Sequence, residues 1–249
     1  MTTTSAPAVH AEPCMGTVFS FRITGRGLAT GSLEQALARI HAIDAMFSTY
    51  REDSQISRLR SGDLRLPDAS PDVRRVLQEC ERLEHLTDGY FSARPDGDHL
   101  DPSGYVKGWA VQEASGILAA AGSRDHCVNG GGDVLCLGAP EPGRGWRVGI
   151  SDPHDSSRLL ETLEATGPVA VATSGTAQRG AHILDPHTGR RRTELASVTV
   201  IAPDIVTADV YATAAVAMGP RRAGEWLAGQ AGIRAVLVLA DGRRTDIPG

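Results

Sequence analysis

The hydrophobic pattern of this chain changes near residue 126, and that change constrains the fold more than any other feature. Before it, apolar residues recur every three or four positions, which predicts amphipathic helices at 32–47, 70–89 and 104–122. After it, the apolar runs are short, rich in Val and Ile and bounded by Gly or Pro. These runs predict strands at 134–137, 146–150, 169–172, 197–202 and 235–239.

The sequence also predicts a strand before residue 126 and two helices after it. Residues 17–24 alternate apolar and polar side chains, as a half-buried strand does. Ala-rich segments predict two further helices, at 209–218 and 221–229. At the first helix, Ser32 and Gln35 have the spacing of a capping box. Because helices come first and strands and helices are mixed afterwards, the order favours an α+β fold over a regularly alternating parallel sheet.

Length and charge limit the classes of protein to consider. The 249 residues fit one large domain or two small interleaved ones. We expect residues 14–249 to form a single domain after a disordered tail at 1–13. Hydrophobic residues make up 41% and charged residues 22%, which is ordinary for a globular protein. Lys and Arg number 25 against 30 Asp and Glu, a formal net charge of −5. A protein that binds nucleic acid or an anionic membrane surface usually has a basic surplus, so we expect neither partner.

The sequence also argues against a membrane span and a zinc site. No run approaches the ~20 apolar residues that cross a bilayer. The N-terminus lacks the basic and apolar segments of a signal peptide, which predicts a cytoplasmic protein unless a signal was removed. The cysteines have no C-x-x-C spacing, which disfavours zinc. They are Cys14, Cys80, Cys127 and Cys136.

Asp209 and Thr213 are the first candidates for chemistry. They lie four residues apart in a predicted helix, so their oxygen atoms share one face. A carboxylate with a hydroxyl suits Mg²⁺, which prefers oxygen ligands and keeps water and substrate phosphates in its shell. The alternative is that Asp209 caps a helix that begins near Ala208.

Two other segments have both a functional and a structural interpretation. Residues 129–133 contain three consecutive glycines, which either let the backbone approach a ligand or form a tight turn. This segment fits neither a Walker loop nor a dinucleotide-binding motif. His182 could act as a general base near neutral pH, or it could be a buried histidine of an apolar strand.

The remaining candidates are a lysine and several aromatic residues. Lys107, near the start of the third helix, could meet an anion or stay solvated. Tyr50, Tyr90 and Phe91 could stack on a flat ring or pack in the core.

Nine short motifs run in a fixed order from about residue 14 to 240, and together they resemble the ApbE family, the FAD:protein FMN transferases. They include M-G-T, V-N-x-G-G-D, A-T-S-G, H-I-x-D-P-x-T-G and A-D-x-x-A-T-A. The nine lie at 15–17, 47–59, 87–91, 101–110, 128–133, 172–175, 182–189, 197–202 and 208–214.

The resemblance implies an ApbE-like (T-fold-like) catalytic domain of α+β class, in which two interleaved halves hold the flavin between them. Members of the family cleave FAD at its pyrophosphate, attach FMN through a phosphoester to a Thr or Ser of a target flavoprotein, and release AMP. It therefore implies Mg²⁺ as cofactor, FAD as substrate and an acceptor flavoprotein with a D-x-x-[ST]-G-A-[ST] motif as partner. The cation is needed because the diphosphate is negatively charged.

The resemblance also implies a role for individual residues. Asp209 and Thr213 match the family's Mg²⁺ ligands, with the backbone carbonyl of Gly104 as a third. His182 matches the histidine proposed to take the proton of the acceptor hydroxyl. The residues that match FAD contacts are Met15, Tyr50, Tyr90, Phe91, Ser92, Asp101 and Lys107.

Two features depart from the family pattern. Ser92 stands where the family usually has Asp, and the segment at 94–100 is shorter than in long members. Two other functions stay open at this point. One is a Mg²⁺-dependent FAD pyrophosphatase that produces FMN and AMP, and the other is a flavin-binding protein without catalytic activity.

Overall fold

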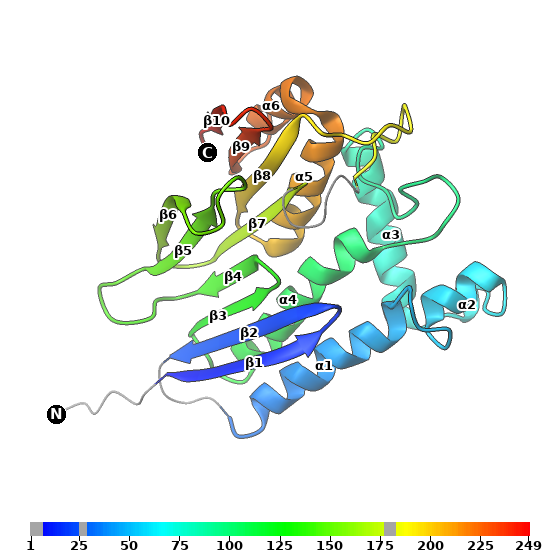
Figure 1. Ribbon diagram of the computed structural model, residues 1–249. Coiled ribbons are helices and arrows are strands. Elements are labelled where there is room, and N and C mark those ends of the chain that lie inside the picture. The colour runs from blue at the N-terminus through cyan, green and yellow to red at the C-terminus, as the bar shows by residue number, and fades with distance from the viewer. Residues whose placement is uncertain (1–6, 25–28, 177–182) are drawn as a thin grey trace.

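The computed structural model describes residues 7–24, 29–176 and 183–249. In this part of the chain, an eight-stranded sheet forms the centre of the fold (Figure 1). Its strands follow one another in chain order, and every neighbouring pair is antiparallel. They are β1 (Ala8–Cys14), β2 (Thr17–Thr24), β3 (Asp125–Gly130), β4 (Asp133–Leu137), β7 (Val169–Gly175), β8 (Leu195–Ala202), β9 (Arg234–Leu239) and β10 (Arg244–Ile247).

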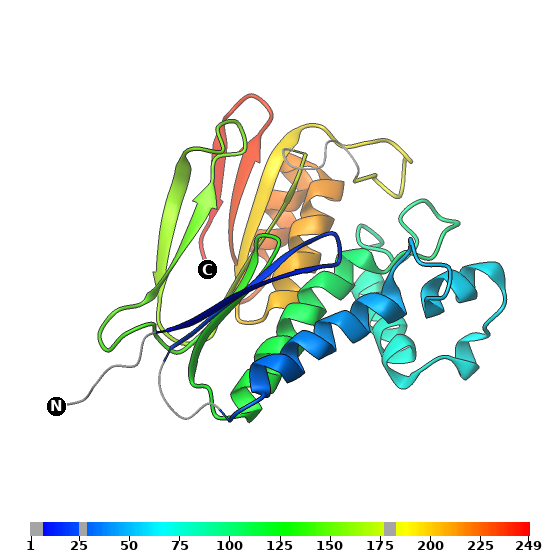
Figure 2. The ribbon, with the colours of Figure 1, turned by 60° about the horizontal axis from the view of Figure 1, so that its bottom comes forward.

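Helices cover one face of this sheet, and a separate hairpin covers part of the other (Figure 2). The hairpin consists of β5 (Trp146–Ser151) and β6 (Leu159–Ala165). In the described part of the sequence, four α-helices lie between β2 and β3, and two lie between β8 and β9. They are α1 (Ser32–Phe47), α2 (Gln55–Ser61), α3 (Pro71–Leu86), α4 (Ser103–Ala120), α5 (Ile205–Met218) and α6 (Pro220–Ala228), with a 3₁₀ turn at Leu66–Asp68. The α+β class is therefore confirmed.

Strand β4 shows how the two layers share the sheet. Leu135 packs into the main core beneath the helices, whereas Val134 and Cys136 pack against Trp146 and Val148 of β5. Successive side chains of a strand point to opposite faces, so a strand between two layers is apolar on both. This explains why the central strands appear in the sequence as continuous apolar runs.

The predicted N-terminal cap is confirmed for α3 but not for α1. At α3, Pro71 occupies the first turn and the Ser70 hydroxyl accepts a hydrogen bond of 3.3 Å from the Val73 N–H, as expected. At α1, the predicted capping box is wrong. Gly31 is the N-cap in a left-handed conformation, and the Ser32 hydroxyl instead donates to the Ala29 carbonyl. The chain enters α1 through a backbone shape that favours glycine, which leaves Ser32 inside the helix.

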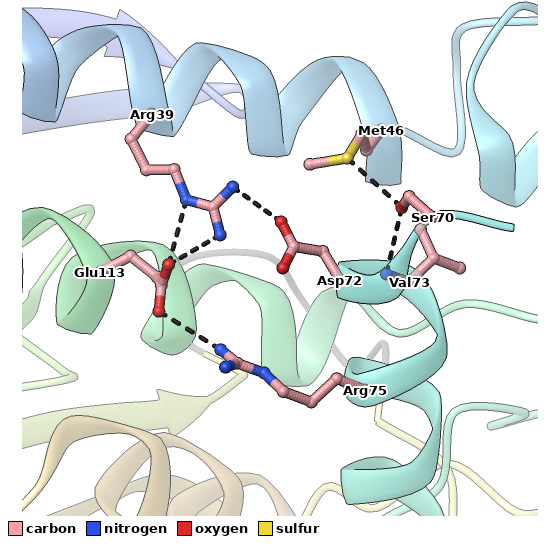
Figure 3. A network of polar contacts seen from close by, with 7 residues as sticks. All are labelled: Arg39, Met46, Ser70, Asp72, Val73, Arg75 and Glu113. Atoms are coloured by element: carbon pink, nitrogen blue, oxygen red, sulfur yellow. Dashed lines mark hydrogen bonds and ion pairs between the residues drawn. The ribbon is translucent and has the colours of Figure 1, made fainter.

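An ionic network joins α1, α3 and α4 (Figure 3). Arg39 of α1 contacts Asp72 of α3 and Glu113 of α4, each at 2.7 Å. Arg75 of α3 approaches the same Glu113 at 3.4 Å. The network therefore holds α4, which carries several of the candidate site residues, against the two helices beside it.

Several elements were not predicted. Residues 8–13, expected in the disordered tail, belong to β1, which pairs with β2 along its length. Helix α2 and strands β3, β6 and β10 also had no prediction. Strand β6 contains two glutamates among its seven residues and shows no buried position, so it gives no apolar signal. No helix within the described residues is long and apolar enough to cross a membrane.

Candidate active site

A cavity of about 940 Å³ lies where the helical layer, the main sheet and the β5–β6 hairpin meet. Its walls come from β2, the segment after α3, the start of α4, the β3–β4 hairpin, β5, β7 and α5. Ligand-binding pockets usually measure about 300–1,000 Å³, so this cavity has room for a ligand of dinucleotide size.

The structure brings most of the predicted site residues to this one cavity, although they span more than a hundred positions in the sequence. The residues that line it are Tyr90, Phe91, Ser92, Asp101, Gly104, Lys107, Asp209 and Thr213. Met15 and Tyr50 are not among the described residues that line it. Tyr50 is 96% exposed, and Met15 packs at the margin of the main core. His182 lies outside the described residues.

Asp209 does not cap α5, so that alternative is wrong. The helix begins at Ile205, and Asp204 is its N-cap, whose carboxylate accepts a hydrogen bond of 2.8 Å from the Thr207 N–H. Asp209 therefore lies more than a turn inside the helix, where it is buried, and Thr213 follows one turn later. A buried carboxylate needs polar or charged partners, and the cavity wall supplies them.

Helix α4 supplies two of these partners. The backbone N–H of Gly108 donates a hydrogen bond of 3.2 Å to Asp209 Oδ2, and Lys107 Nζ lies 3.7 Å from the same oxygen. A Cβ atom on Gly108 would lie only 3.1 Å from Asp209 Oδ2 and 3.3 Å from the Ile205 carbonyl oxygen. Glycine therefore permits the close approach of α4 and α5 that places the carboxylate.

Lys107 also contacts Asp133, the first residue of β4, whose side chain is buried. One ammonium thus lies beside two buried carboxylates, of which that of Asp209 lines the cavity. Asp133 belongs to the glycine-rich motif at 128–133, but the sequence indicates no role for it. The available signal was a single carboxylate at the start of an otherwise apolar strand.

The glycine run forms the tight turn between β3 and β4 and also reaches the cavity. Gly131 and Gly132 both line it, with φ values of 64° and 103°. A Cβ atom on Gly131 would lie 2.5 Å from the Thr17 hydroxyl oxygen. The predicted tight turn is therefore confirmed, and the approach of this backbone to a ligand stays a prediction.

Ser174, at the end of β7, is a second residue to which the sequence gave no role. Its hydroxyl lies 3.0 Å from the Thr213 hydroxyl, within hydrogen-bonding distance, and both residues line the cavity. Ser174 can therefore fix the direction in which the Thr213 oxygen presents its lone pairs.

The segment that follows residue 182 is held against the turn after α3. His187 Nε2 lies 2.8 Å from the Asp88 carbonyl oxygen, and its ring meets Tyr90 edge-on at 4.6 Å between centroids. The guanidinium carbon of Arg222, from α6, lies 4.9 Å from the centroid of the Tyr90 ring. The same guanidinium forms an ion pair of 2.8 Å with the Asp88 carboxylate. These contacts anchor a wall of the cavity.

Asp185 gives this segment a second anchor. It is buried, and its carboxylate pairs with Arg192 at 2.7 Å. Burial alone would raise the pKa of Asp185, but hydrogen bonds from Thr188 and the His187 N–H, together with the Arg192 charge, lower it below its ordinary value.

A cavity of this size whose wall carries a carboxylate, a hydroxyl and a lysine is typical of proteins that bind a phosphorylated ligand together with a divalent cation. The ApbE family model matches residues 15–94 and 92–237, and the chain belongs to the ApbE family.

Comparisons with individual proteins support this family assignment. The chain is similar to an FAD:protein FMN transferase of Vibrio cholerae serotype O1, with 29% identity over 87% of this chain and 83% of that protein. It is 36% identical to an FAD:protein FMN transferase of Rhodobacter capsulatus, over 68% of this chain and 34% of that protein. Its fold matches the flavin transferase ApbE from Vibrio cholerae with a TM-score of 0.83 and 25% identity, over 97% of each chain. The ApbE-like fold is therefore confirmed.

Proposed function

We propose that this protein is a Mg²⁺-dependent FAD:protein FMN transferase. It cleaves the pyrophosphate of FAD, attaches FMN through a phosphoester to a Thr or Ser of an acceptor flavoprotein, and releases AMP. The observation that carries the proposal is the arrangement of Asp209 and Thr213 on one face of α5, beside Lys107, at the wall of a cavity of about 940 Å³. Membership of the ApbE family supports it, because relatives in that family bear this name.

The residues at the wall fit a magnesium ion. Asp209 would supply a carboxylate oxygen, Thr213 a hydroxyl and Gly104 a backbone carbonyl, and all three line the cavity. Within the described residues there is no cluster of three or more His, Cys, Asp or Glu that could hold a metal. Mg²⁺ does not need one, because one or two carboxylates with substrate phosphates complete its shell. When bound, it would offset the negative charge of the diphosphate.

The other residues of the wall would bind and orient FAD. Lys107 would meet a phosphate oxygen, with Asp133 fixing the direction of its ammonium group. Tyr90 would present aromatic surface to a flat ring, and Ser92 and Asp101 would add polar groups near it. Phe91 lines the cavity too, but it is buried in the main core and would pack behind such a ring. Because Ser92 has a hydroxyl instead of a carboxylate, it can both donate and accept a hydrogen bond.

His182 would act on the acceptor. As the acceptor oxygen forms its bond to the FMN phosphorus and the bond to AMP breaks, His182 would take the hydroxyl proton. The acceptor would be a flavoprotein with a D-x-x-[ST]-G-A-[ST] motif, as the family resemblance implies.

The proposed roles of Met15 and Tyr50 rest on the resemblance alone. FAD titrations of Tyr50→Ala and Tyr90→Ala variants test the two rings separately. A ring stacked on the ligand contributes about 1–3 kcal/mol, so losing it should weaken binding by roughly tenfold or more. Unchanged affinity in either variant would remove that ring from the proposed FAD site.

The cation site is tested by following AMP release from FAD with Mg²⁺ and an acceptor domain. We expect Asp209→Asn to abolish AMP release, because it removes the charge and keeps the size of the side chain. Excess EDTA should do the same to the unmodified protein. The exposed Asp63→Asn is the control and should behave as the unmodified protein. AMP release that survives both treatments would contradict the magnesium site.

A further inference from the structure

Cys127 and Cys136 face each other across the β3–β4 hairpin. The two residues are direct partners in the antiparallel register, and their sulfur atoms lie 3.1 Å apart. Directly opposed residues in such a ladder have Cα atoms about 4.5–5.5 Å apart, which falls within the range of about 4.4–6.8 Å that a disulfide spans. The Cα spacing of such a pair and the short distance between the sulfurs are therefore compatible with a disulfide.

The pair lies on the wall of the cavity and has two unequal members. Both cysteines line the cavity, but Cys127 is partly exposed, whereas Cys136 is buried against Trp146 and Val148 of β5. Cys127 is therefore the member of the pair that is more open to a small molecule in the cavity.

The electrostatic surroundings separate the two thiols further. The Cys136 thiol donates its hydrogen bond to the Cys127 sulfur, which lowers the pKa of Cys127 despite burial, and the nearby Arg22 charge acts in the same direction. The same hydrogen bond and burial raise the pKa of Cys136. The partly exposed member of the pair, Cys127, is thus the one that favours the thiolate, the nucleophilic form of a cysteine.

We propose that Cys127 and Cys136 form a redox-active dithiol, which low-molecular-weight disulfides that enter the cavity oxidise to an intramolecular disulfide. Neither FAD nor Mg²⁺ takes part in this reaction, so it stands apart from the proposed transferase activity.

The reaction proceeds by two thiol–disulfide exchanges. The Cys127 thiolate attacks one sulfur of the disulfide RSSR, forms the mixed disulfide Cys127–S–S–R and releases RS⁻, which takes up a proton. Cys136 then loses its proton to solvent and attacks the Cys127 sulfur, which releases a second RS⁻. The two thiols of the protein are oxidised to a disulfide, and one RSSR is reduced to two RSH.

The other two cysteines of the chain serve as internal controls. Cys14 and Cys80 are buried, and burial raises their pKa values to about 11 and about 12. Cys14 packs against the Ile40 carbonyl oxygen and His41, at 3.6 and 3.7 Å, and has no cysteine beside it. Neither has the position of an exchange site.

The experiment uses the folded protein and oxidised glutathione, followed by N-ethylmaleimide, trypsin and mass spectrometry. Cys127 and Cys136 fall in one tryptic peptide, residues 125–144, whereas Cys14 and Cys80 fall in two others. We expect this peptide to lose two hydrogens and to resist N-ethylmaleimide, and we expect dithiothreitol to reverse the change. Cys80→Ser should give the same result. A peptide that still takes up two N-ethylmaleimide groups, or that carries two glutathione groups, would overturn the proposal.

Two single variants test the order of attack. Cys136→Ser should trap glutathione on Cys127, because no second thiol is present to release it. Cys127→Ser should acquire no glutathione at Cys136. Glutathione on Cys136 of the second variant, with both variants folded by circular dichroism, would contradict the assignment of Cys127 as the attacking residue. An absence of glutathione on Cys127 of the first variant would contradict it equally.

Discussion

The backbone N–H of Gly108 in α4 donates a hydrogen bond of 3.2 Å to the Asp209 carboxylate in α5. The missing Cβ atom of Gly108 makes this close approach of the two helices possible. The contact fixes the direction of the carboxylate that the proposed function assigns to Mg²⁺.

Gly108→Ala should therefore destabilise the protein. The added methyl group would crowd Asp209 and the Ile205 carbonyl, and overpacking of this kind costs about 1–3 kcal/mol. Gly116→Ala is a matched control in the same helix, because no atom beyond its chain neighbours and the helix's own backbone lies within 4 Å of its Cβ position. It should raise the free energy of unfolding by about 0.5–1 kcal/mol through helix propensity. Urea denaturation measures the free energy of unfolding of both variants. Equal stabilisation by the two substitutions would contradict the role given to Gly108.

Ser174→Ala should raise the Mg²⁺ concentration needed for AMP release. Ser174 contacts the Thr213 hydroxyl at 3.0 Å, and residues that orient a metal ligand typically contribute about 10–100-fold to metal affinity. Thr199→Val is the control, since it breaks the neighbouring hydroxyl pair between Thr173 and Thr199, which does not include Thr213. A Mg²⁺ dependence that is the same in Ser174→Ala and the unmodified protein would remove Ser174 from the site.

His182→Ala should slow transfer without weakening the binding of FAD. A general base contributes about 10²–10⁴-fold, so the transfer rate should fall by that factor. In the unmodified protein the rate should rise with pH through the titration of an imidazole, near ~6.5. Transfer rates at several pH values, with FAD titrations in parallel, measure both effects. A variant that no longer binds FAD would show a structural role for His182.

Asp185→Asn should destabilise the protein in a pH-dependent way. The pKa of Asp185 is lowered in the folded protein, so the ionised carboxylate contributes stability above the ordinary aspartate value of about 3.9. That contribution disappears as the pH falls through the lower pKa of the folded state. The difference in free energy of unfolding between the two proteins should therefore be full near about pH 7 and shrink below about pH 4. A difference that stays constant over this range would show that the Arg192 pair is not its source.

The parts of the fold that depend on local signals could be predicted from the sequence. Ser70 and Pro71 mark the start of α3 because capping and the fixed φ of proline act within one turn. The shared face of Asp209 and Thr213 follows from helical spacing, whatever packs around them. In contrast, the ordered strand at 8–14 gains its structure from pairing with β2, and its mostly exposed side chains give no apolar pattern that would reveal it.

The contacts that complete the site were beyond prediction for a related reason. Lys107 meets Asp133 only because α4 crosses the start of β4, and Cys127 meets Cys136 only in one register of the β3–β4 hairpin. Slipping a strand by one residue would turn every side chain to the opposite face. Such pairings are properties of the packed chain, and the residue types alone do not determine them.

The central claim is the transfer of FMN to a protein hydroxyl, and intact-mass measurement of an acceptor domain tests it most directly. The chain, FAD and Mg²⁺ would be incubated with a domain that carries a D-x-x-[ST]-G-A-[ST] motif, and with the same domain after replacement of the final Thr or Ser by Ala. We predict that the first domain gains one FMN, that AMP appears in equal amount, and that the Ala domain gains nothing. Formation of AMP and free FMN with an unmodified acceptor would show a pyrophosphatase and contradict the account, and binding of FAD without any AMP would contradict it as well.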